Sequence, residues 1–163
     1  MAYLLDANAF IETEKRWYGF DICPAYWDWL DAAHAAGSVF SIERVATEIL
    51  AGHDELSDWA RGQADSFFLR PDGLLLASMS QLSAWVTAGQ YDQSAVATFL
   101  DVADSYLVAQ AHACGHTVVT HEKVANSRRN VKIPNACAEM GVKYMTPFDM
   151  LRLERARFVV TTP

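Results

Sequence analysis

The chain opens on a short apolar run that stops at a carboxylate. Tyr3-Leu4-Leu5-Asp6-Ala7-Asn8 is followed by residues 9–12, which have a helical composition. This pattern is typical of a buried parallel strand that passes directly into a strand-to-helix turn. Ligands of open α/β sheets bind just beyond the carboxyl ends of such strands. The opening strand is therefore predicted to be central in a sheet, and Asp6 is the first candidate for chemistry.

Strands and helices are predicted to alternate along the rest of the chain. Besides the opening strand, β-forming runs cover 38–42, 117–120 and 142–145, with 67–69 a short strand or connector and 158–160 an edge strand or a trailing end. Helical patterns cover 9–15, 25–36, 43–50, 54–64, 78–88, 93–114 with a break near Thr98, 133–141 and 147–155, and residues 123–132 form a loop. Such alternation predicts right-handed crossovers and a parallel sheet covered on both faces.

Size and charge narrow the class of protein. A chain of 163 residues, 52% hydrophobic and 20% charged, predicts a single compact domain over 1–163. Its net charge of -7 argues against nonspecific binding of nucleic acid through overall charge. A nuclease stays compatible with this charge, because carboxylates that hold divalent cations count as negative in the total.

Cysteines and apolar segments indicate a soluble protein of a reducing compartment. Cys23, Cys114 and Cys137 are widely spaced and lack a zinc-binding pattern. The sequence predicts neither a signal peptide nor a membrane span, so we expect a cytoplasmic protein without membrane contact. The aromatic residues between Trp17 and Trp29 have two interpretations, which are core packing and a surface for a protein partner.

Four acids lie where a parallel sheet could bring them together. Asp6 ends the first strand, and Glu122 follows the strand at 117–120. Glu48 and Asp104 lie inside helical patterns, where an ionised side chain that faced the core would be costly unless paired or bound to metal. Carboxylates without zinc-type spacing favour Mg²⁺ or Mn²⁺, which promote phosphodiester hydrolysis. Taken singly, each acid is better explained as a helix cap or a solvated surface group, whereas for the four together a metal site is as well supported as that explanation.

Four motifs in order resemble those of PIN-domain proteins. Leu4–Ile11 resembles the opening motif, and Thr47–Leu50 resembles the second motif, a glutamate followed by apolar residues. Ala103–Ala111 is similar to the third motif, and Val118–Glu122 resembles the fourth, a strand that ends in Val-Thr-x-Asp. The ending from Val131 to Val142 resembles a PIN-like group of bacterial proteins of this size.

The resemblance implies a function as well as a fold. It implies a three-layer α/β/α domain with a mostly parallel central sheet, in which Asp6, Glu48, Asp104 and Glu122 are catalytic and hold Mg²⁺ or Mn²⁺. The implied activity is metal-dependent endoribonuclease cleavage of RNA, as the toxin of a type II toxin–antitoxin system. The implied partners are an RNA substrate, a cognate antitoxin protein and a second copy of the chain in a homodimer.

Neighbouring residues modify this expectation. Ala7 replaces the usual Thr or Ser, Glu122 replaces Asp, and Asn135 lies where a further acid is expected in the PIN-like group. Asn8 is predicted to support the site, and Thr120 to orient Glu122 or a metal-bound water through its hydroxyl.

The basic residues after Glu122 have two interpretations. Arg128, Arg129 and Lys132 either contact RNA phosphates at the rim of an acidic cleft or belong to a solvated loop. The alternative for the whole protein is a PIN-like module that no longer cleaves and binds a partner through residues 17–29.

Overall fold

The computed structural model describes residues 2–160, and its central feature is a parallel sheet. Within these residues the sheet has five strands in the order β3-β2-β1-β4-β5, and every pair is parallel. The strands are β1 (Tyr3–Leu5), β2 (Val39–Ile42), β3 (Phe68–Leu69), β4 (Thr117–Val119) and β5 (Tyr144–Met145). The strand β1 is the middle one, as the sequence predicts, and Leu4 and Leu5 are fully buried.

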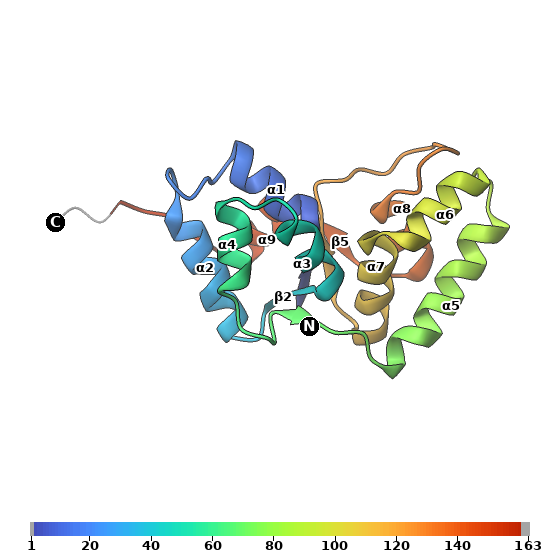
Figure 1. Cartoon of the computed structure of the whole chain (residues 1–163), viewed down its shortest axis with the longest axis horizontal. Coiled ribbons are helices and arrows are strands. Elements are labelled where there is room, and N and C mark those ends of the chain that lie inside the picture. Colours follow the sequence, from blue (N-terminus) through green and yellow to red (C-terminus); the bar gives the residue numbers. More distant parts are fainter. Residues whose placement is uncertain (1, 161–163) are drawn as a thin grey trace.

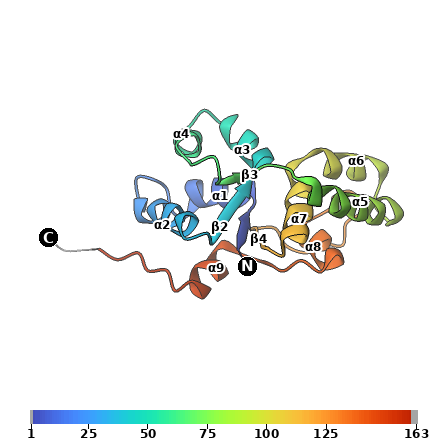
Figure 2. The ribbon, with the colours of Figure 1, turned by 90° about the horizontal axis from the view of Figure 1, so that it is seen from below.

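Helices cover both faces of the sheet and make the domain a three-layer α/β/α fold. The described helices are α1 (Ala7–Arg16), α2 (Pro24–Ala35), α3 (Glu43–Leu50), α4 (Glu55–Arg61), α5 (Gly73–Ala88), α6 (Gln93–Asp101), α7 (Ala103–Cys114), α8 (Ile133–Met140) and α9 (Pro147–Leu153). Figure 1 shows α1, α2 and α4 on one side of the strands and α5 to α8 on the other. The turned view in Figure 2 separates the same two groups of helices.

The order of the strands creates a switch point beside β1. The chain first moves outward from β1 to β2 and β3, and then returns past β1 to β4 and β5. Connections on the two sides of this point lie on opposite faces, so a crevice opens at the carboxyl ends of β1 and β4. Asp6 and Thr120 follow these two strands directly.

Several predicted boundaries are corrected by the structure. The break in the long helical pattern lies at Val102, whose extended backbone (ψ 174°) separates α6 from α7, and not near Thr98. The helix α5 begins at Gly73 instead of Ser78, because the Asp72 side chain accepts hydrogen bonds from the backbone N–H groups of Leu74 and Leu75. Within the described residues, 158–160 form no strand.

The aromatic segment after α1 serves mainly the core. Tyr26 and Trp27 are 0% and 2% exposed, and Trp27 stacks on Phe20 with ring centroids 4.2 Å apart. Trp17 is half exposed and contacts Phe148 edge-on. Burial therefore accounts for most of this segment. In the described part of the chain, no helix is both long and apolar enough to cross a membrane.

Candidate functional site

A chain of hydrogen bonds joins the ends of β1 and β4. The Asp6 backbone N–H donates to the Val119 carbonyl at 3.0 Å, which aligns the two strand ends. The Thr120 hydroxyl donates to Asp6 Oδ2 at 2.9 Å, and the Thr120 hydroxyl oxygen accepts a hydrogen bond from the Glu122 backbone N–H at 3.1 Å. Thr120 therefore links two of the predicted site residues and fixes the direction of the chain between them.

Asp6 is an unusually buried acid. It is the N-cap residue of α1, yet within residues 2–160 its side chain makes no capping hydrogen bond to that helix. Only 2% of the residue is exposed. Burial and the negative charge of Asp104 raise the pKa of Asp6 to about 7, although the Thr120 hydrogen bond opposes the shift. The interpretation of Asp6 as a simple helix cap does not explain this arrangement.

Asp104 is positioned by the break between α6 and α7. Because α7 starts afresh at Ala103, Asp104 lies in its first turn, where a carboxylate interacts favourably with the helix dipole. Burial and the charges of Glu122 and Glu48 nevertheless raise the pKa of Asp104 to about 6, with Lys132 acting in the opposite direction. Asp104 is thus close to both other acids and to a cation.

Glu48 lies at the rim of this group. Its neighbours Val45 and Ile49 are buried, but Glu48 itself is largely exposed and does not face the core. Partial burial of its carboxyl group raises its pKa, and a hydrogen bond from the Ala103 backbone lowers it. Glu48 therefore approaches the start of α7, one residue from Asp104.

Arg44 joins α3 to the junction between α6 and α7. It lies one turn before Glu48 on α3 and donates a hydrogen bond to the Asp101 carbonyl at 2.7 Å. Its guanidinium lies 3.7 Å from the centre of the Tyr106 ring. These contacts join α3 to the α6–α7 junction and so keep Glu48 beside Asp104.

Glu122 is held from three directions. Its Oε1 accepts from the Lys132 ammonium at 2.8 Å, its Oε2 accepts from the Ile133 backbone N–H at 2.8 Å, and its own N–H bonds to Thr120. The side chain is 15% exposed. Glu122 therefore fixes the far end of the loop 123–132 against the start of α8.

Asp104 and Glu122 line a pocket of about 230 Å³. Arg129 and Lys132 also line this pocket, as do Ser94 and Thr98 of α6. The pocket is therefore acidic at Asp104 and Glu122 and basic along the loop, as expected from the sequence.

The other predicted site residues do not line this pocket, and these include Asp6, Glu48 and Thr120. Arg128 lines a neighbouring pocket and lies 3.7 Å from the Asp92 carboxylate. Asn8 is exposed in the first turn of α1. Asn135, where a further acid was expected, accepts the Ala125 N–H at 3.1 Å and donates to the Ala125 carbonyl at 3.0 Å. The Asn135 side chain thus clamps the loop and does not extend the acidic group.

The donor chemistry suits a hard divalent cation. The four acids supply oxygen donors of the kind that Mg²⁺ and Mn²⁺ prefer, and burial together with the negative charges of Asp104 and Glu122 raises the pKa of Asp6. A bound cation would relieve this repulsion. In the described chain, however, no three His, Cys, Asp or Glu side chains already form a set that could hold a metal ion. Closer approach of the carboxylates would be required.

Some contributors could not be recognised from the sequence. The Ile133 backbone N–H carries no residue signature, and Ser94 and Thr98 lie in an ordinary helical pattern. The Ser41 hydroxyl donates to the Leu5 carbonyl at 2.6 Å and supports the strand end before Asp6. A serine inside a β-forming run was the only available signal for it.

Comparison with known proteins identifies the family of the chain. No curated protein matches the chain. A family described as a domain of unknown function (DUF4411) matches residues 3–158, which is nearly the whole chain. The chain therefore belongs to the DUF4411 family.

Proposed function

We propose that this protein is a PIN-like endoribonuclease that depends on Mg²⁺ or Mn²⁺ and hydrolyses RNA phosphodiester bonds. The observation that carries the proposal is the grouping of Asp6, Asp104 and Glu122 at the switch point of the sheet. Thr120 bonds to both Asp6 and Glu122, Asp104 and Glu122 line one pocket, and burial together with the negative charges of Asp104 and Glu122 raises the pKa of Asp6. The four sequence motifs that resemble PIN domains support the same assignment.

The acids and their neighbours would have different roles in the reaction. Asp6, Glu48, Asp104 and Glu122 would hold the cation, and Thr120 would orient Asp6. When bound, the cation would lower the pKa of a water and stabilise charge on the leaving oxygen. In hydrolysis a bond forms between the water oxygen and phosphorus, the bond to the leaving ribose oxygen breaks, and that oxygen gains a proton. Arg129 and Lys132 would bind the phosphate at the rim.

A cleavage assay tests the proposal with a matched control. Purified protein would be incubated with RNA and Mn²⁺ or Mg²⁺, beside Asp104→Asn and the exposed Asp101→Asn, which lies only three residues away. We expect wild type and Asp101→Asn to cut RNA, and Asp104→Asn to lose at least about a hundredfold in rate, as for a group that acts on the transition state. Equal cutting by Asp104→Asn, or no cutting by wild type, would refute the proposal.

The biological setting proposed is a type II toxin–antitoxin pair in the cytoplasm, with a cognate antitoxin and a homodimer as protein partners. The PIN resemblance alone supports this setting. Induced expression of wild type should stop bacterial growth and degrade RNA, whereas Asp6→Asn should do neither. Growth arrest by both proteins to the same extent would instead favour a module that acts by binding a partner.

A further inference from the structure

A second pocket lies beside the acidic one and has a different chemistry. It measures about 230 Å³ and is lined by the rings of Trp85 and Tyr91 together with Asn126, Ser127, Arg128 and Asn135. The two rings meet nearly edge-on, with centroids 5.8 Å apart. A pocket that combines aromatic rings with amide and hydroxyl groups can stack a planar heterocycle and bond its edge.

The aromatic rings are held in place by the end of α5. Gly89 follows the last turn of α5, and an atom at its Cβ position would lie 3.4 Å from the Tyr91 ring. The Trp85 side chain comes from the last turn of the same helix and meets the Tyr91 ring nearly edge-on. Both rings are partly exposed. The platform is therefore formed before any ligand arrives, which limits the entropy lost on binding.

A single ridge separates the two pockets. Arg128 lines the aromatic pocket, and the next residue, Arg129, lines the acidic one. In the segment that leads into α6, Tyr91 lines the aromatic pocket and Ser94 the acidic one. The Asp92 N–H joins this segment to the loop by donating to the Arg128 carbonyl at 2.9 Å, and this contact forms the ridge. Because consecutive residues are only about 3.8 Å apart, the pockets are close enough to hold adjacent nucleotides.

The loop 123–132, which contributes Arg128 to the ridge, carries concentrated positive charge. Residues 123–132 contain four of the 13 basic residues and not a single acid, in a chain whose net charge is -7. Lys132 pairs with Glu122, and Arg128 lies loosely by Asp92, with both side chains well exposed. Within residues 2–160, Arg129 has no ion pair. A phosphate that crosses the ridge would find a cation on either side.

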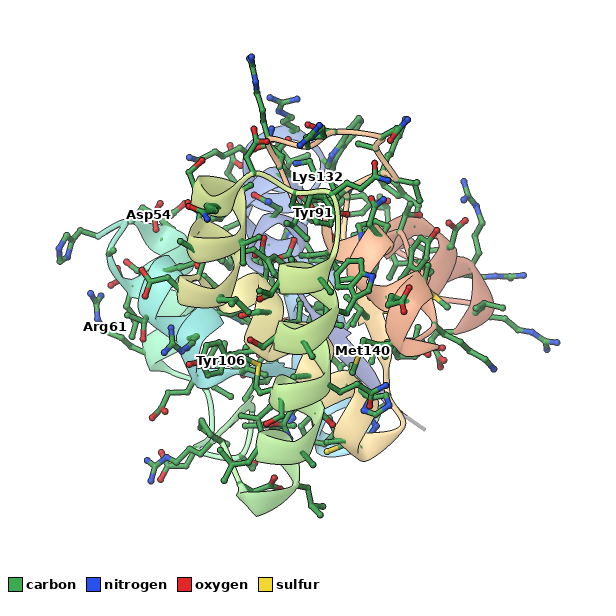
Figure 3. The ribbon with its side chains drawn as sticks, turned by 90° about the vertical axis from the view of Figure 1, so that its right-hand side faces the viewer. Asp54, Arg61, Tyr91, Tyr106, Lys132 and Met140 are labelled. Carbon is green, nitrogen blue, oxygen red and sulfur yellow. The ribbon has the colours of Figure 1, made fainter. Side chains whose placement is uncertain are left out.

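Figure 3 shows Tyr91 and Lys132 at the same end of the molecule, away from Tyr106 and Met140. We propose that the pocket at Trp85 and Tyr91 receives an unstacked base of a single-stranded RNA, while the adjoining phosphate crosses the Asp92–Arg128 ridge toward the acidic pocket. The inference rests on the proposed function, because it assigns the strand that the acids would cut. It also predicts a preference for single strands, since a duplex has no free base to insert.

Binding of RNA without metal tests the pocket separately from cleavage. A short fluorescent oligoadenylate would be titrated in EDTA, with polarisation as the readout, against wild type, Tyr91→Leu, Tyr91→Phe and Trp17→Leu. Trp17 is a half-exposed tryptophan in the turn after α1, outside the pocket, and serves as the matched control. We expect about tenfold weaker binding for Tyr91→Leu, because it removes one stacking surface. Tyr91→Phe and Trp17→Leu should bind like wild type.

Tryptophan fluorescence and thermal melting provide two further tests of the pocket. RNA should quench the fluorescence of Trp85 in wild type and in Trp17→Leu, and folded Tyr91→Leu should need about tenfold more RNA for the same quenching. Thermal melting of each variant shows that it is folded. Equal affinity of folded Tyr91→Leu and wild type, or equal affinity of wild type for duplex and single strand, would overturn the inference.

The two proposals can fail independently. If wild type binds RNA through Tyr91 but does not cut it with Mn²⁺, the pocket stands and the proposed activity falls. If wild type cuts RNA and Tyr91→Leu has the same KM, the activity stands and the pocket falls. An increase in KM with kcat unchanged in Tyr91→Leu supports both.

Discussion

At the scale of single residues, the burial of Asp6 is energetically costly. A carboxyl group that is 2% exposed is surrounded by apolar strand residues and faces another acid. Burial of a charge without a partner cation is unfavourable, so the group holds a proton to a higher pH than usual. Asp6 therefore contributes little to stability by itself, which is typical of a residue that serves a site.

The raised pKa values of the buried acids predict how the stability of the metal-free protein depends on pH. The pKa of Asp6 rises from 3.8 to about 7, and that of Asp104 from 3.8 to about 6. Between the ordinary pKa of 3.8 and these raised values, the folded state binds more protons than the unfolded state. The free energy of unfolding therefore decreases as pH rises from about 4 to about 7 and then levels off. Asp6→Asn should reduce this loss and raise the free energy of unfolding at pH 8 by on the order of 2 kcal/mol. Thermal melting in EDTA across this range measures it.

The exposed Asp101→Asn is the control and should follow the wild-type pH curve. Addition of Mn²⁺ at pH 8 should stabilise wild type more than Asp6→Asn, because cation binding favours the folded state. A wild-type pH profile that Asp6→Asn reproduces would show that Asp6 is not the titrating group.

Thr120 gives a second prediction at this scale. Its hydroxyl both donates to Asp6 and accepts from Glu122, so Thr120→Val leaves a buried carboxyl oxygen and a backbone N–H without their partner. We expect a loss of about 1–3 kcal/mol in the free energy of unfolding. The Mn²⁺ concentration needed for half-maximal cleavage should also rise, because Asp6 loses its orientation.

Thr120→Ser retains the hydroxyl and should restore the Mn²⁺ requirement, even if the lost methyl group lowers stability. Denaturant unfolding and cleavage at graded Mn²⁺ concentrations separate the two effects. A Thr120→Val protein with an unchanged Mn²⁺ requirement would limit Thr120 to a structural role.

At the scale of elements, the loop 123–132 is defined by its anchors. Glu122 ties one end to Lys132 and Ile133, Asn135 clamps Ala125, and Asp92 joins Arg128. Each anchor links the loop to a different element: the end of β4, the start of α8 and the start of α6. A segment without regular secondary structure is thereby fixed between the two pockets.

Asn135 supplies the prediction for this element. Its amide oxygen accepts from Ala125 N–H, and its NH₂ donates to the Ala125 carbonyl. An ionised Asp has no donor, so Asn135→Asp should lose one of these hydrogen bonds and cost about 1 kcal/mol in the free energy of unfolding. It should not increase metal-dependent cleavage, because this side chain bonds to the loop. Urea denaturation and the RNA assay measure these effects, and higher activity would contradict the clamp.

The sequence predicts the elements better than it predicts these contacts. Apolar runs and helical spacing indicate the strands and most helices, and the strand ends locate Asp6 and Glu122, because local patterns determine them. The break in the helical pattern 93–114 is predicted near Thr98 but lies at Val102, because its position depends on tertiary packing. The contacts of Lys132 and Asn135 depend on the path of the loop, and the loop sequence has no apolar periodicity from which that path could be predicted.

At the scale of the whole molecule, charge is distributed unevenly. The chain has a net charge of -7, yet the segment 123–132 carries four cations without an acid and lies at one end of the molecule. Figure 1 shows this segment running across the top of the view toward α8. A long-range field would repel RNA, whereas the loop would attract it within a screening length of about 10 Å. Orientation rather than overall attraction would govern RNA binding.

The salt dependence of RNA binding tests this distribution. Each phosphate contact to a single strand contributes about -0.7 to the slope of log affinity against log salt. If Arg128 and Arg129 each contact a phosphate, Arg128→Gln with Arg129→Gln should make the slope shallower by about 1.4. The matched control changes Arg61 and Arg152 to Gln, because both pair with aspartates elsewhere on the surface. That control alters the net charge equally but should leave the slope unchanged, and an equal change in both double variants would mean that overall charge, not the loop, governs binding.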